Sequence, residues 1–217
     1  MKNLAMSLIM LMTVSAQAAL LSYTAGDKNN SGIVLNQSAV INDAAGKPTA
    51  LTMDLLGAGL RTKRVLIVDA KVYVAQLFSD NKAGFTRDAG ALQSLVQNST
   101  RVALKIDMLR TVTAVDLSNS FKEALTANKI AIDTEMTNIL ALFSKSADAA
   151  SGKSLTVLMV KDAKNVKTNL YYEDAAGKTQ SLVGSPEVMT KIMSIWLGTP
   201  ADSGLEKLKA SLLVRVY

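Results

Sequence analysis

The side chains able to do chemistry in this chain form a short list. The sequence contains no histidine and no cysteine, which excludes Ser-His-Asp and Cys-His nucleophilic sites, imidazole proton transfer and soft metal sites. Disulfide bonds are excluded with them. Any catalysis would have to rest on Asp, Glu, Lys, Arg, Tyr, Ser or Thr, so we assign no catalytic residue, no metal and no cofactor.

The densest group of charges is Arg61-Thr62-Lys63-Arg64. A guanidinium is a rigid fork of N–H donors that pairs bidentately with a carboxylate, and a phenol such as that of Tyr73 adds a further donor. The residues alone leave two interpretations open. Either Arg61 and Tyr73 bind an anion, or Arg61 starts a solvated turn and Tyr73 belongs to the core with its hydroxyl at the rim.

The remaining charges are scattered, in a chain of net charge +6 with four Phe and one Trp. Basic and aromatic residues do not interleave, so nucleic acid is not an expected partner. A mild attraction to anionic lipids or acidic small molecules is compatible with this charge. Asp69 has three possible roles: it pairs with Lys71, pairs with Lys63, or lines a pocket.

The N-terminus has the pattern of a cleavable secretory signal peptide. Met1-Lys2-Asn3 is a positive n-region, Leu4–Val14 is apolar, and Ala16-Gln17-Ala18 supplies the small residues of a cleavage site before Ala19. The alternative, a membrane anchor, requires about 20 apolar residues, and the apolar run is shorter. We therefore expect residues 1–18 to be a signal peptide and 19–217 to be one periplasmic or secreted domain without stable membrane insertion.

Hydrophobic periodicity predicts strands in the first part of this domain. Ser38–Ile41 and Ala50–Leu55 are short apolar-rich runs, and Val65–Phe78 is a long β-branched run. In the long run, one parity carries the apolar residues Leu66, Val68, Ala70, Val72, Val74 and Phe78, and the other is mixed. It is therefore expected to be a central strand with one dry face and one amphipathic face.

The rest of the chain alternates between helical and strand patterns. A helix, Asp88–Gln97, precedes a strand over Val102–Met108, and strands return at Leu155–Val160 and in a hairpin. Ser185 is expected to cap a further helix with Pro186 at its first position. Together these elements predict an α+β fold, with helices covering one face of an antiparallel sheet. The other expected segments are the helices Val112–Asn128 and Ala131–Ser144, the hairpin strands Asn169–Tyr172 and Gln180–Val183, and a last helix from Asp202.

One pentapeptide occurs twice. Asp-Ala-Ala-Gly-Lys stands at 43–47 and again at 174–178. We interpret the repeat as shared turn chemistry, in which Asp starts the turn and Gly adopts a positive φ, rather than as a duplication.

The segment Gly57-Ala58-Gly59-Leu60-Arg61, followed by Val72-Tyr73, resembles the chalcone isomerase superfamily. In that family a Gly-x-Gly-x-Arg turn leads into a strand with a Val-Tyr pair. The segment from Ile195 to Asp202 resembles the family's closing helix and turn. With a signal peptide, the chain is similar to the bacterial chalcone isomerase-like proteins. The resemblance implies a large antiparallel sheet, a helical layer and a ligand pocket between the two.

The resemblance also implies roles for particular residues. The family's motif arginine maps to Arg61, and a Gly57–Gly59 turn would direct it into the pocket. The strand threonine of the isomerases falls at Val68, and no tyrosine occurs in Thr111–Glu123, where a helix tyrosine and asparagine are expected. The carboxylate-binding pair of the fatty-acid-binding members maps to Arg61 and Tyr73.

The leading hypothesis is therefore a non-enzymatic binder of a fatty acid or similar amphipathic carboxylate. The first alternative is an intramolecular lyase or isomerase acting on a chalcone-like phenolic substrate, with Arg61 as the electrophile. The second alternative is a structural or partner-binding envelope protein.

Overall fold

The computed structural model describes residues 18–217, so the expected signal peptide lies outside the described residues except for Ala18. Its centre is an eight-stranded antiparallel sheet in which each strand pairs with the next along the chain. The strands are β1 (Leu21–Asn30), β2 (Ile33–Asn42), β3 (Pro48–Val65), β4 (Val68–Ser79), β5 (Arg101–Met108), β6 (Ser154–Lys161), β7 (Thr168–Glu173) and β8 (Thr179–Gly184).

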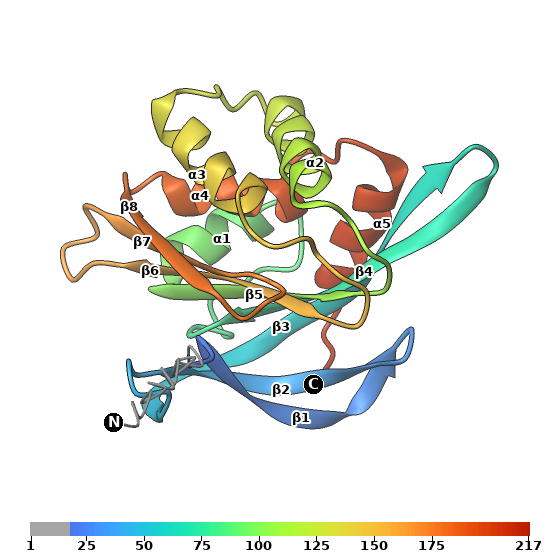
Figure 1. The fold of residues 1–217 in the computed structure, drawn as a ribbon. Coiled ribbons are helices and arrows are strands. Elements are labelled where there is room, and N and C mark those ends of the chain that lie inside the picture. The colour runs from blue at the N-terminus through green and yellow to red at the C-terminus, as the bar shows by residue number, and fades with distance from the viewer. Residues whose placement is uncertain (1–17) are drawn as a thin grey trace, which may run out of the picture.

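Five helices lie together on one side of this sheet (Figure 1). They are α1 (Ala91–Asn98), α2 (Ala114–Ala127), α3 (Thr134–Ser144), α4 (Val188–Leu197) and α5 (Ser203–Leu212). The α+β fold with a helical layer over an antiparallel sheet is therefore confirmed.

The main core fills the space between the helices and the sheet. Its centre is a row of aromatic rings in edge-on contact. The ring centroids of Trp196 and Phe121 are 5.3 Å apart, those of Phe121 and Phe143 5.1 Å, and those of Phe143 and Tyr172 4.7 Å. This geometry is favoured by the ring quadrupoles, and it joins α2, α3 and α4 to β7.

A second, smaller core lies on the other side of the sheet, because β1 and β2 curl beneath it (Figure 1). The Tyr23 hydroxyl on β1 lies 3.2 Å from the Thr156 hydroxyl on β6, and the Leu20 N–H donates to Glu173 at 2.5 Å. The Tyr217 hydroxyl donates to the Leu35 carbonyl at 3.2 Å. The sheet is thus covered on both faces, which the sequence-based prediction of one covered face did not include.

The long run Val65–Phe78 is not one strand, and that prediction was wrong. It is interrupted by a two-residue turn at Leu66 and Ile67, so β3 and β4 form a hairpin that projects from the body (Figure 1). Leu66 is 93% exposed and Ile67 86%. A strand pattern of period two continues unchanged through such a turn, so periodicity cannot reveal it. Further along, Tyr73 and Leu77 are buried on one face of β4 and Val74 and Phe78 on the other.

Two smaller differences from the prediction concern the start of α4 and the strand β1. Helix α4 begins at Val188 with Glu187 as N-cap, and Ser185 instead donates its hydroxyl to Glu135 at 2.9 Å. Strand β1 was not predicted. The two Asp-Ala-Ala-Gly-Lys turns are confirmed: each Asp side chain accepts backbone hydrogen bonds within its turn, and Gly46 and Gly177 have φ of +79° and +78°.

Candidate functional site: a cavity between β3, β4 and helix α2

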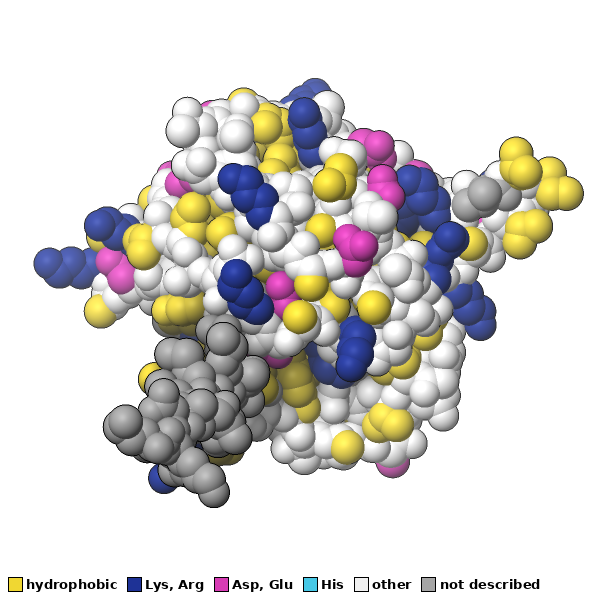
Figure 2. All heavy atoms as spheres, in the orientation of Figure 1, with side chains coloured by type: hydrophobic (Ala, Val, Ile, Leu, Met, Phe, Trp, Pro, Cys, Tyr) yellow, Lys and Arg dark blue, Asp and Glu magenta, His cyan; other side chains and the backbone are white. Residues whose placement is uncertain are grey.

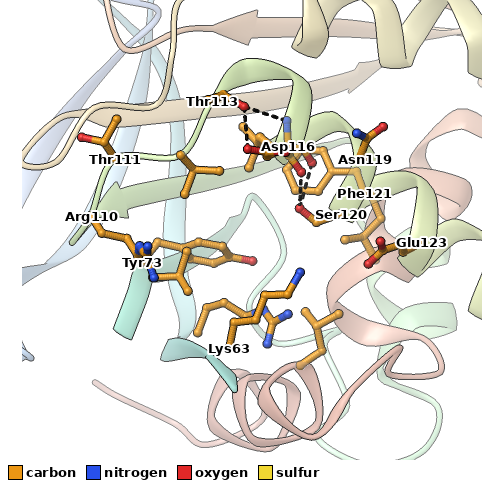
Figure 3. A pocket seen from close by; sticks show the side chains of 16 residues that line it. Lys63, Tyr73, Arg110, Thr111, Thr113, Asp116, Asn119, Ser120, Phe121 and Glu123 are labelled. Atoms are coloured by element: carbon orange, nitrogen blue, oxygen red, sulfur yellow. Dashed lines mark hydrogen bonds between the residues drawn. The ribbon is translucent and has the colours of Figure 1, made fainter. Parts of the chain in front are cut away.

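A cavity of about 480 Å³ lies where α2 and the ends of α4 and α5 meet strands β3 and β4 (Figure 3). This is within the size range of small-molecule sites. Its lining divides into a buried part and an exposed rim. The buried lining residues are Arg61, Tyr73, Leu117, Phe121, Ile195 and Leu205, and the exposed ones are Lys63, Arg110, Thr111, Thr113, Asp116, Asn119 and Glu123.

Arg61 and Tyr73 face each other across the β3–β4 ladder, where they are directly paired. Arg61 is 6% exposed and Tyr73 5%. The structure therefore brings the two predicted ligand-binding residues together at the cavity. In Figure 3 the Tyr73 side chain extends from the sheet into the space between the strands and α2.

The Arg61 guanidinium is held by Asp202, which precedes α5. Its two terminal nitrogens donate to the two carboxylate oxygens of Asp202 at 2.7 and 2.6 Å, and one of them also donates to the Thr62 carbonyl. A bidentate pair of this kind fixes both the position and the plane of the guanidinium. Since Asp202 is 141 residues away from Arg61 in the sequence, periodicity gives no signal for the contact.

Asp202 has a second role as the N-cap of α5, where it accepts from the Leu205 N–H at 2.9 Å. Burial by itself would raise the pKa of this carboxyl. The hydrogen bonds from Arg61 and from the backbone of Leu205 outweigh burial and lower the pKa of Asp202 below its usual value. The carboxylate is therefore charged at neutral pH and neutralises Arg61.

The Tyr73 hydroxyl is positioned by Trp196, whose indole N–H donates to it at 3.1 Å. Burial raises the pKa of Tyr73 and outweighs the hydrogen bond from Trp196 and the nearby charge of Arg61. The phenol thus stays protonated. Because its oxygen accepts from Trp196, its O–H proton can be donated to a ligand.

The glycines of the Gly-x-Gly-x-Arg segment do not form a turn, and that part of the prediction was wrong. Gly57 and Gly59 lie within β3. A Cβ at Gly57 would lie 1.9 Å from the Leu212 carbonyl oxygen, and one at Gly59 would lie 2.7 Å from the Ser211 Cβ. Both glycines therefore allow α5 to pack directly on the strand that carries Arg61.

Gly204 continues the same contact from the helix side. A Cβ there would lie 1.8 Å from the Thr62 carbonyl oxygen and 2.2 Å from an Arg61 nitrogen. The close packing of α5 on β3 is what brings Asp202 within reach of Arg61.

The rim is formed mainly by the start of α2. Thr113 is its N-cap: the hydroxyl accepts from the Asp116 N–H at 3.0 Å and donates to the Asp116 carboxylate at 2.8 Å (Figure 3). The cations Lys63 and Arg110 stand on the rim with the acids Asp116 and Glu123. An anionic ligand would thus meet both signs of charge at the entrance and, inside, the Arg61 guanidinium paired with Asp202.

Several positions implied by the resemblance differ from expectation. Val68 lies on the projecting hairpin, 64% exposed, and does not line the cavity. Asp69 pairs with Lys207 at 3.5 Å, not with Lys63 or Lys71, and does not line the cavity either. The helical segment from Thr111 to Glu123 does line it, Asn119 included.

Asp202 and Trp196 contribute contacts that the sequence-based site did not include. Both lie in the C-terminal segment that resembles the family's closing helix and turn, so the resemblance was the available signal. Within the described residues, no group of three or more Asp, Glu, His or Cys is arranged to hold a metal ion. None of the helices in residues 18–217 has the length and apolar character needed to cross a membrane.

Comparison with known proteins places this arrangement in a family. The chain resembles the crystal structure of a fatty-acid binding protein of Arabidopsis thaliana with a TM-score of 0.62 and 15% sequence identity, over 87% of this chain and 95% of the plant chain. The sequence has no significant match among curated proteins. The profile of the chalcone isomerase-like family matches residues 35–214. That span includes β3 and β4, which carry Arg61 and Tyr73, and the helix α5. The family profile thus covers most of the chain, and the chain belongs to the chalcone isomerase-like family.

Proposed function

We propose that this protein is an exported, non-catalytic binder of a fatty acid or similar amphipathic carboxylate. The observation that carries the proposal is the position of a buried arginine and a protonated tyrosine beside an apolar cavity wall. Arg61 and Tyr73 supply donors for a carboxylate, and Leu117, Phe121 and Ile195 supply apolar surface for a chain. A few polar groups in a mostly apolar concavity are typical of small-molecule sites.

The donors at the polar end are only partly used within the protein. A guanidinium has five N–H groups. Those of Arg61 donate to Thr62 and Asp202, and Arg61 also hydrogen-bonds to the Tyr73 side chain. The Tyr73 O–H and the Arg61 N–H not used in these contacts are the donors that we propose for a ligand. We propose that a ligand carboxylate accepts from these groups beside Asp202, which keeps the guanidinium in place.

The fold of the Arabidopsis protein supports the choice of ligand class. Its name describes fatty-acid binding, and its fold is similar to that of this chain with a TM-score of 0.62. Fatty acids are for this reason the first probes to use with the present protein.

The test is calorimetry with saturated fatty acids of increasing length. Affinity should rise by about 0.8 kcal/mol per buried methylene until the cavity is full. Arg61→Ala should weaken binding by about 2–5 kcal/mol, and Tyr73→Phe by about 1–2 kcal/mol, as for a hydrogen bond to a charged group. Arg61→Lys should restore binding only in part, because an ammonium cannot make the bidentate contact.

The matched control is Arg101→Ala. Arg101 pairs with Asp80 at 3.0 Å outside the cavity, so this variant removes a comparable ion pair and should leave fatty-acid affinity unchanged. A folded Arg61→Ala protein that binds palmitate as tightly as the wild type would show that the carboxylate site lies elsewhere.

The isomerase alternative has a separate test. We expect no chalcone cyclisation above the uncatalysed rate, because Val68 is on the exposed hairpin and no tyrosine occurs in α2. General acid–base groups typically contribute about 10²–10⁴-fold. A rate enhancement that disappears in Arg61→Ala would favour the isomerase. If neither fatty acids nor chalcones bind, the structural or partner-binding alternative is favoured.

Export is tested on the protein recovered from the cell envelope. N-terminal sequencing should give a chain that begins at Ala19. Recovery with Met1 intact, or retention in membranes after a carbonate wash, would contradict the proposed signal peptide.

A further inference from the structure

The β3–β4 hairpin ends in an apolar tip that has no counterpart elsewhere among the described hairpins. Leu66, Ile67 and Val68 are 93, 86 and 64% exposed. The hairpin extends beyond the body of the protein (Figure 1), and hydrophobic side chains form its outer end in Figure 2. Exposed side chains of this size next to one another mark interaction sites in soluble proteins.

Positive charge surrounds this tip. Lys63 and Arg64 on β3 and Lys71 on β4 are exposed just behind it. Asp69, the acidic residue of β4, is paired with Lys207 of α5 at 3.5 Å. The surface therefore presents an apolar point followed by a net positive collar, and we call it the basic-collared tip (Leu66, Ile67, Val68, Lys63, Arg64, Lys71).

We propose that the basic-collared tip docks on the surface of a bilayer that contains anionic lipids. Leu66 and Ile67 enter the boundary between headgroups and acyl chains, and Lys63, Arg64 and Lys71 contact anionic headgroups. Apolar insertion combined with Lys and Arg at headgroup level is the usual chemistry of peripheral membrane binding. A second copy is the alternative occupant, because the cavity of this chain has apolar walls and the acids Asp116 and Glu123 on its rim. The rim also carries the cations Lys63 and Arg110, which repel the basic collar, so a bilayer with anionic lipids fits the tip better.

The cavity lies next to the stem of the hairpin that carries the proposed membrane contact. Arg61 and Lys63 belong both to the stem of the hairpin and to the cavity lining, as do Val72 and Tyr73. Docking through the tip therefore places the cavity mouth near the headgroups. The proposal itself depends only on the tip, and it stands whether or not the cavity takes a fatty acid.

Vesicle flotation tests the docking, with the protein as recovered from expressing cells and its N-terminus determined by mass. The probes are vesicles of phosphatidylethanolamine with phosphatidylglycerol and, in parallel, vesicles of phosphatidylcholine alone. The wild type should float with the anionic vesicles, and raising the salt concentration should weaken binding. The double variant Leu66→Asp, Ile67→Asp should lose at least about tenfold in affinity.

Charge and surface controls separate the two parts of the contact. Arg64→Gln and Lys71→Gln should each weaken binding about fivefold on anionic vesicles and have little effect on phosphatidylcholine. Val166→Asp is the matched control, since Val166 is 56% exposed in a turn away from the tip, and it should bind like the wild type.

Because the chain contains no cysteine, a fluorophore can be attached uniquely at Ile67→Cys or Val166→Cys. Anionic vesicles should shift the emission of the label at position 67 to shorter wavelength and leave that at position 166 unchanged. Failure of the wild type to bind vesicles would overturn the proposal. So would vesicle binding that the tip substitutions leave intact, or a dimer that they convert to a monomer, which would assign the tip to a second copy.

Discussion

The turns at 43–47 and 174–178 consist of the same five residues, whereas the β3–β4 turn consists of Leu66 and Ile67. In the first two, an Asp side chain accepts the N–H groups of the residues two and four positions later, at 2.9–3.0 Å. Glycine takes the positive φ in both. In the β3–β4 turn no Asp or Gly is present, and Leu66 itself has a φ of +57°.

This difference shows that the tip residues are not explained by turn formation. Two-residue hairpin turns favour Gly, Asn or Asp where φ is positive, and the left-handed region costs other residues about 1–2 kcal/mol. A leucine at such a position carries this conformational cost, and its exposed side chain gains no burial energy to offset it. The chain uses a better turn sequence twice elsewhere, so the apolar tip is best explained by a contact outside the protein.

The hairpins also differ in how they are fixed to the body. Each Asp-Ala-Ala-Gly-Lys turn contains its own carboxylate. The β3–β4 hairpin is fixed at its base by a carboxylate from another element, Asp202, which holds Arg61.

The largest effect is expected for Asp174→Ala. Asp174 is buried, and besides its own turn it accepts from the Ala147 N–H at 3.2 Å. Its loss leaves buried donors unpaired and should lower the free energy of unfolding by about 2–4 kcal/mol. The exposed Asp43 makes only the turn contacts, so Asp43→Ala should cost about 1 kcal/mol. Urea denaturation of both variants measures the difference, and equal costs would contradict it.

Gly177→Ala measures the energetic cost of a residue other than glycine at a positive φ. The φ of Gly177 is +78°, and a Cβ there would have no described atom within 4 Å. The expected cost is about 1–2 kcal/mol, arising from conformation alone, measured by thermal and urea unfolding. A cost near zero would mean that a positive φ is not penalised in these hairpins, which would weaken the argument about Leu66.

Low pH should weaken the stabilising contact between Asp202 and Arg61 at the base of the β3–β4 hairpin. The pKa of Asp202 is lowered in the folded protein, so its contribution to stability is present above the unfolded-state pKa and is lost as pH falls through the lower, folded-state value. Asp202→Asn keeps an N-capping side chain and removes the charge. The stability difference between wild type and this variant should therefore shrink below about pH 4. A difference that stays constant with pH would contradict this.

The smallest effect is expected for Leu66→Gly. Glycine removes the energetic cost of the left-handed conformation, but it also loses more conformational entropy on folding than leucine does. The first effect is slightly larger, so the free energy of unfolding should rise by less than about 1 kcal/mol. The same variant should bind anionic vesicles more weakly than the wild type. Increased stability together with weakened vesicle binding would separate the two roles of this residue, whereas a loss of stability would show that Leu66 has contacts within the fold.

The fold was predictable where the burial pattern is local. In Arg101–Met108 every second residue from Val102 to Met108 is apolar and packs in the main core, and the stripe of α3 follows from burial of one side of that helix. Strand β1 escaped prediction because its second half, from Gly26 to Asn30, is polar: this edge strand has few buried positions. The β3–β4 turn escaped because its apolar residues face solvent.

For the candidate site, the family resemblance identified Arg61 and Tyr73, which the structure brings together at the cavity; their role in binding stays a prediction. The residues that orient Arg61 and Tyr73 could not be identified from the sequence in the same way. Asp202 and Trp196 are 141 and 123 residues from the groups they contact. Such contacts depend on how α4 and α5 pack on the sheet, and the glycines that permit this packing look like turn residues in the sequence.

The curl of β1 and β2 beneath the sheet has a consequence for the order of folding. Neighbouring strands in this sheet are mostly close in sequence, but the contacts that close the second core join residues 133, 153 and 182 positions apart. Closing such long loops is slow compared with forming local contacts. As the chain emerges from its N-terminal side, Leu21 and Ala39 appear well before Leu158 and Tyr217, against which their layer packs. The first strands to be made are therefore the last to be buried, and their apolar face is the one that needs protection while the chain is being completed.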